Sequence, residues 1–106
     1  MTRYKLEDKV VLITGAGRGI GAATATTLAE RGAHVVVLDI DGDAAGETAA
    51  DLPHGGGLAI EADVTDPTAM RAAVEHVVET YGRLDVVVAN AGILGPPSTF
   101  RAATRE

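Results

Sequence analysis

Glycines alternate with other residues through positions 15–21, directly after a short apolar run, and this arrangement could bind a phosphate group. The run is Val-Val-Leu-Ile-Thr at residues 10–14. A phosphate needs free backbone N–H groups, and the N-terminus of a helix presents them together with the favourable end of the helix dipole. Gly15 is expected to allow the sharp turn, Gly19 to let the backbone approach a pyrophosphate, and Gly21 to let the helix lie close to the sheet.

An acidic residue follows at the spacing that a dinucleotide site requires. Asp39 lies 18 residues after Gly21, near the end of the apolar segment 34–40. A carboxylate there can accept both ribose hydroxyls and repels a 2′-phosphate, which favours NAD over NADP. Arg18 acts in the opposite direction, because a guanidinium at the turn could pair with the 2′-phosphate. The predicted cofactor is NAD, with NADP less favoured; Asp39 could instead cap the next helix, although Asp41 is better placed for that role.

Two alternating periodicities predict the elements that position these residues. Short apolar runs predict strands, and they cover residues 10–14, 34–40, 58–62 and 84–89. Helices are predicted over 20–31, over 41–52 and from the Asp66-Pro67 cap to Gly82. Strands that alternate with helices form right-handed crossovers and a parallel sheet. The predicted fold class is therefore α/β, a Rossmann-type doubly wound sheet with about four strands in the order 3-2-1-4 and three helices.

The spacing of small and apolar residues predicts which helix faces pack on the sheet. For the first helix the predicted face is Ile20, Ala23, Thr24, Thr27 and Leu28. For the third helix the apolar stripe is Met70, Ala73, Val74, Val77, Val78 and Tyr81. Both sets are expected to lie in the core.

Composition limits the partners and the compartment that we expect. The chain has 106 residues, enough for one domain, and a formal net charge of −6. An acidic surface argues against nucleic acid and anionic membranes as partners, since both need a positive footprint. There is no cysteine, and the three histidines share no ligand spacing, so no metal site is predicted. Residues 1–9 are too charged for a signal peptide, and a cytoplasmic location is expected.

Further motifs complete a resemblance to the short-chain dehydrogenase/reductase family. The turn that contains Gly15, Gly19 and Gly21 is similar to the cofactor turn of that family. Asp63-Val64 resembles its Asp-Val pair, in which the Asp lies near the adenine amino group. Asn90-Ala91-Gly92 resembles its Asn-Ala-Gly motif, which closes over the cofactor and steadies the sheet, although Ala89 replaces a second Asn.

The resemblance implies a set of cofactor-binding residues that extends beyond the glycines and Asp39. Ile20 is expected to supply the backbone N–H nearest the pyrophosphate, whereas Ile40 and Val64 are expected to flank the adenine as apolar walls. The complete predicted set is Gly15, Arg18, Gly19, Ile20, Gly21, Asp39, Ile40, Asp63, Val64, Asn90, Ala91 and Gly92.

The residues that carry out catalysis in the resembled family have no counterpart here. Family members use a Ser and a Tyr with a Lys four residues later, but Asp8 and Asp85 lie four residues after Tyr4 and Tyr81. We therefore expect residues 1–106 to be the N-terminal half of an NAD(P)-binding Rossmann domain, truncated before its catalytic segment. Its substrate in a full enzyme would be an alcohol or a carbonyl compound. The open edge of the fourth strand favours a homo-oligomer.

The sequence is also compatible with two alternatives to an oxidoreductase. One is a non-catalytic nucleotide-binding module that uses the same residues. The other is a methyltransferase that binds S-adenosylmethionine at the glycine turn. That site usually has an acid before the first glycine, where this chain has Ile13-Thr14.

Overall fold

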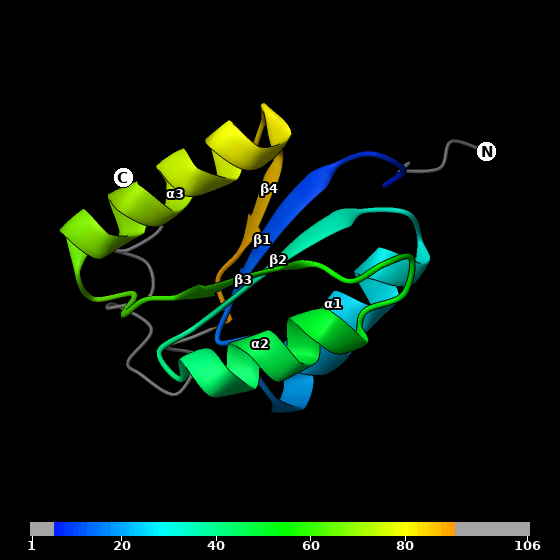
Figure 1. Ribbon diagram of the computed structural model, residues 1–106, viewed down its shortest axis with the longest axis horizontal. Helices are drawn as coiled ribbons and strands as arrows, with labels where there is room; N and C mark the ends of the chain where they lie inside the picture. Colours follow the sequence, from blue (N-terminus) through cyan, green and yellow to red (C-terminus); the bar gives the residue numbers. More distant parts are fainter. Residues whose placement is uncertain (1–5, 91–106) are drawn as a thin grey trace.

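Strands and helices alternate along the chain and build a parallel sheet between two helical layers (Figure 1). The computed structural model describes residues 6–90. The elements are β1 (Val10–Thr14), α1 (Gly19–Glu30), β2 (His34–Asp39), α2 (Gly42–Asp51), β3 (Leu58–Glu61), α3 (Pro67–Tyr81) and β4 (Val86–Val88). The sheet has the order β3-β2-β1-β4, and all neighbouring strands are parallel. The predicted fold class and strand order are confirmed.

The two central strands, β1 and β2, are buried on both faces. Val11, Ile13, Val35 and Val37 belong to the core under α1 and α2. Val10, Leu12, Val36 and Leu38 belong to the core under α3, which covers the opposite face (Figure 1). A strand that is covered on both faces needs a continuous apolar run rather than an alternating one, which explains the composition of these segments.

The face of α1 that packs on the sheet differs from the predicted one. The buried residues are Gly21, Ala25 and Ala29, whereas the side chain of Ile20 is 76% exposed. Of the predicted face, Leu28 packs against the core. A row of glycine and alanine at i, i+4 and i+8 allows the closest approach of helix to sheet, and this approach determines how α1 is rotated.

The apolar face of α3 is narrower than predicted. Ala73 and Val77 are buried, and Met70 and Tyr81 pack partly buried beside them. Val74 and Val78 are more than one-third exposed. The ends of α3 are as predicted. Asp66 caps the first turn, since its Oδ1 accepts from the backbone N–H groups of Thr68 and Ala69. Gly82 ends the helix in the left-handed conformation.

A side-chain clamp joins β4 to the start of β1. Asp85 Oδ2 accepts from the backbone N–H of Val10 at 2.8 Å, and the Asp85 N–H donates to the Val10 carbonyl at 2.9 Å. Arg83 donates from Nε and Nη2 to the other carboxylate oxygen. The hydrogen bonds from Arg83 and from the Val10 N–H lower the pKa of Asp85. The ionised carboxylate therefore contributes to the attachment of β4 to the sheet.

Candidate dinucleotide site at the carboxyl edge of the sheet

The turn between β1 and α1 leaves the first turn of the helix without a side-chain cap. Arg18 is the N-cap residue, but its side chain makes no capping hydrogen bond, and the first helical turn contains no acidic residue. Gly15 and Gly19 both have a φ of 64°, a backbone conformation that strongly favours glycine. The N-terminus of α1 therefore presents backbone N–H groups and the positive end of the helix dipole, as an anion requires.

Two glycines of this turn differ in the space around them. A Cβ atom added at Gly19 would meet no atom within 4 Å. A Cβ atom at Gly21 would lie 2.5 Å from the Gly15 carbonyl oxygen and 2.8 Å from Nδ2 of Asn90. Gly19 thus borders open space that a phosphate could enter, whereas Gly21 lets α1 cross directly over the turn.

Asn90 joins the end of β4 to the same turn. Its backbone N–H donates to Thr14 Oγ1 at 3.0 Å, and its side-chain Nδ2 donates to the Gly15 carbonyl at 3.0 Å. These contacts hold the turn in place from the neighbouring strand. The predicted site residues Ala91 and Gly92 lie outside the described residues.

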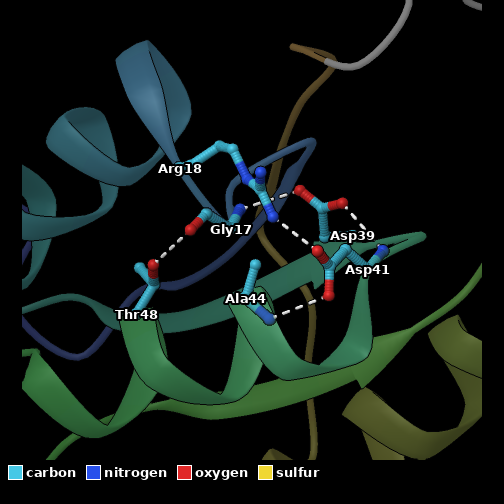
Figure 2. A network of polar contacts seen from close by, with 6 residues as sticks. All are labelled: Gly17, Arg18, Asp39, Asp41, Ala44 and Thr48. Carbon is cyan, nitrogen blue, oxygen red and sulfur yellow. Dashed lines mark hydrogen bonds and ion pairs between the residues drawn. The ribbon is translucent and has the colours of Figure 1, made fainter.

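Asp39 ends β2, and its carboxylate faces the glycine turn (Figure 2). Oδ2 accepts from the backbone N–H of Gly17 at 2.9 Å, and Oδ1 accepts from that of Asp41 at 2.9 Å. The two hydrogen bonds fix the carboxylate beside the turn. Each oxygen retains a second lone pair that can accept from another donor, such as a ribose hydroxyl.

Arg18 and Asp41 form an ion pair across the same turn (Figure 2). Asp41 is also the N-cap of α2, since its Oδ1 accepts from the Ala44 N–H at 3.1 Å. Thr48, one turn further along α2, donates from Oγ1 to the Gly17 carbonyl at 2.7 Å. The cap was predicted from the sequence, but the ion pair and the contacts of Gly17 were not. No local pattern signals them, because they depend on where α2 packs.

A cleft of about 120 Å³ lies between the carboxyl ends of β1, β2 and β3. Its lining is mainly predicted site residues together with core positions: Gly15, Leu38, Asp39, Ile40, Ala62, Asp63 and Val64. The side chains of Ile40 and Val64 are exposed there, at 66% and 37%. The cleft therefore offers apolar surface next to a carboxylate, as a planar base attached to a ribose requires.

Asp63 is held by its own turn. Its Oδ1 accepts from the backbone N–H of Thr65 at 2.9 Å and from the Thr65 hydroxyl at 2.7 Å. These two hydrogen bonds lower the pKa of Asp63. The residue lines the cleft as an ionised carboxylate, and its other oxygen remains available to a donor such as an exocyclic amino group.

A larger cleft, of about 420 Å³, lies at the opposite edge of the sheet. It is lined by the start of β2, the end of α1 and the loop that follows α2, including His34, Arg31 and His54. It contains none of the glycine-turn residues and no helix N-terminus, so it lacks the anion-binding features that lie beside the smaller cleft. Within residues 6–90, no helix has the length and apolar character to cross a membrane, and no cluster of potential metal ligands is found.

Comparison with protein families identifies related sequences. The family model described as short chain dehydrogenase matches residues 9–106. Versicolorin reductase of Emericella nidulans is 47% identical over 94 residues, which cover 86% of this chain and 36% of that protein. The chain therefore spans little more than a third of the curated relative that it matches.

Solved structures show the same fold with related sequences. The 3-ketoacyl-(acyl-carrier-protein) reductase of Brucella melitensis, crystallised in complex with NADH, matches with a TM-score of 0.74 and 34% identity. This match covers 92% of the present chain and 43% of the reductase. The hydroxysteroid dehydrogenase of Escherichia coli matches with a TM-score of 0.80 and 38% identity, over 92% of this chain and 41% of that one.

Proposed function

This chain belongs to the short-chain dehydrogenase/reductase family, and from that premise we propose that it binds NAD and forms the cofactor-holding part of an oxidoreductase. The reaction interconverts an alcohol and a carbonyl compound by hydride transfer. One observation carries the proposal: the Asp39 carboxylate lies 2.9 Å from the Gly17 N–H, beside the uncapped N-terminus of α1. Family membership and the NADH complex of a structural neighbour support a nicotinamide dinucleotide as the ligand.

The residues of the site divide into groups with different tasks in binding. The glycine turn and the Ile20 N–H hold the pyrophosphate at the N-terminus of α1. Asp39 accepts the ribose hydroxyls, and Ile40 and Val64 enclose the adenine. Asp63 accepts from the adenine amino group.

Asn90 keeps the glycine turn in register with β4, and by the family resemblance Ala91 and Gly92 belong to the same cofactor-binding motif. When bound, the nicotinamide ring supplies or accepts the hydride. The described residues bind the adenosine and the pyrophosphate of the cofactor. Arg18, which belongs to the predicted set, contributes its position in the turn, and its guanidinium is paired with Asp41.

The preference for NAD over NADP follows from charge at the end of β2. A 2′-phosphate would lie beside the Asp39 carboxylate and would be repelled by it, and two backbone N–H groups hold that carboxylate so that it cannot rotate away. Arg18 is already paired with Asp41. Both features favour an unmodified 2′-hydroxyl.

Calorimetric titration of the full chain with NAD, NADP and S-adenosylmethionine tests the proposal. NAD is expected to bind and S-adenosylmethionine is not. Asp39→Asn removes a charge-assisted acceptor and should weaken NAD binding by about tenfold to a hundredfold. Asp51→Asn removes a carboxylate from the other end of α2 and serves as the matched control, with unchanged NAD affinity. Tight binding of NADP without binding of NAD would contradict the assignment of Asp39.

A further inference from the structure

The guanidinium of Arg18, beside the proposed cofactor site, is held by the carboxylate of Asp41, the N-cap of α2. Arg18 lies in the glycine turn, and its Nη2 pairs with Oδ2 of Asp41 (Figure 2). Both side chains reach the surface, with exposures of 71% for Arg18 and 45% for Asp41. A ligand at the ribose end of the site could therefore compete with Asp41 for the same guanidinium.

Asp41 contacts both residues that would act on a phosphate at the ribose 2′ position, Arg18 by attraction and Asp39 by repulsion. Its side chain pairs with Arg18, and its backbone N–H donates to Asp39 Oδ1 at 2.9 Å. The other carboxylate oxygen of Asp41 caps α2 through the Ala44 N–H. The start of α2 thus fixes the carboxylate of Asp41 at the position from which it reaches Arg18.

We propose that Asp41 is a specificity-determining residue of the site, because it holds Arg18 in an ion pair. Arg18 is the only cationic residue in the network of Figure 2, and while it is paired with Asp41 it is not free to bind a 2′-phosphate. This inference rests on the proposed function. Asp39 acts on the ribose directly, whereas Asp41 acts through Arg18 and is a positioning residue. Arginine binds phosphate with two parallel N–H donors, so an Arg18 released from Asp41 would favour NADP.

The charges of the three side chains support this division of roles. Asp39 and Asp41 each carry −1 and Arg18 carries +1, so the network has a net charge of −1 when all three are ionised. Loss of the charge on Asp41 makes the network neutral and leaves Arg18 without its partner. A phosphate group then meets one repelling and one attracting residue, instead of a repelling residue and an arginine that is already paired.

The Asp41→Asn variant removes the ion pair with Arg18 but keeps a side chain that can cap α2. Asparagine is as effective an N-cap as aspartate, so α2 should begin at the same residue. We expect the ratio of Kd for NADP to Kd for NAD, measured by calorimetry on the full chain at one low salt concentration, to fall about fivefold, the factor that the strongest exposed ion pairs represent. Asp43→Asn is the matched control, since it removes the same charge from the first turn of α2 and should leave the ratio unchanged.

A second variant shows whether the effect passes through Arg18. In the double variant Asp41→Asn with Arg18→Gln, the fall in the ratio should disappear. An unchanged ratio in Asp41→Asn, an equal fall in Asp43→Asn, or a fall that persists without Arg18 would each overturn the inference while leaving the proposed function intact. Failure of the unsubstituted chain to bind NAD would instead contradict the proposed function, and the inference with it.

Discussion

Gly21→Ala tests the packing that shapes the glycine turn. The added Cβ would lie 2.5 Å from the carbonyl oxygen of Gly15, 2.8 Å from Cα of Ala16 and 2.8 Å from Nδ2 of Asn90. Two of these three atoms belong to the backbone of the turn, so they cannot move aside as the end of a flexible side chain can. We expect α1 to move away from the turn, and the Asn90–Gly15 hydrogen bond of 3.0 Å to lengthen or break.

Three effects set the size of the expected loss of stability. Overpacking at a tight contact costs about 1–3 kcal/mol. Weakening of the Asn90–Gly15 hydrogen bond costs roughly another 1 kcal/mol. The higher helix propensity of alanine returns about 1 kcal/mol. The free energy of unfolding should therefore fall by about 1–3 kcal/mol, and in a chain of this size each kcal/mol lowers Tm by about 4–8 °C.

Thermal and urea unfolding, followed by circular dichroism, measure this change. Gly46→Ala is the matched control, because Gly46 lies inside α2 and a Cβ there would meet no atom within 4 Å. The control should raise stability by about 0.5–1 kcal/mol through helix propensity alone. If Gly21→Ala were as stable as the unsubstituted chain, or gained stability like the control, α1 would not approach the turn as closely as these distances require.

Two further predictions concern β4. Arg83 and the Val10 N–H lower the pKa of Asp85, so the stability gained from its ionised form is present above the ordinary pKa of 3.8 and is lost as pH falls through the lowered value. Asp85→Asn should therefore reduce Tm at pH 7, by a difference that shrinks below pH 3.8, and a difference independent of pH would contradict this. Val87 is 54% exposed on β4, which among the described strands pairs only with β1. If β4 pairs with a second copy, Val87→Lys should reduce concentration-dependent association in size-exclusion chromatography, whereas a chain that is monomeric at every concentration would argue against pairing through β4.

Local signals in the sequence were sufficient for most of the fold. The runs that form β1 and β2 are apolar throughout because both faces of these strands are covered. Asp66 and Gly82 define the ends of α3 through capping geometry that requires those residue types. The spacing from the glycine turn to Asp39 placed both at one edge of the sheet, where the structure brings them into hydrogen-bond contact.

The rotation of α1 could not be predicted in the same way. Residues 22–27 are all alanine or threonine, so the helix has little contrast between an apolar and a polar face. The closeness of the helix to the sheet selects Gly21, Ala25 and Ala29 for the buried face, and this distance depends on tertiary packing.

The polar network at the turn also could not be predicted from the sequence. The Arg18–Asp41 pair and the hydrogen bond from Thr48 to Gly17 join residues that are 23 and 31 positions apart. Both contacts exist because α2 packs beside the turn. Propensity and spacing located Asp41 as a cap, but they could not indicate which cation its second oxygen would meet.

The most direct test of the binding site is a titration of the ¹⁵N-labelled chain with NAD, followed by backbone amide chemical shifts. Binding at the carboxyl edge of the sheet should move the amide signals of Gly19, Ile20 and Ile40. The signals of His34 and His54, which line the larger cleft at the opposite edge, should stay in place. Shifts confined to those two histidines and their neighbours, with the glycine turn unaffected, would contradict the proposed site.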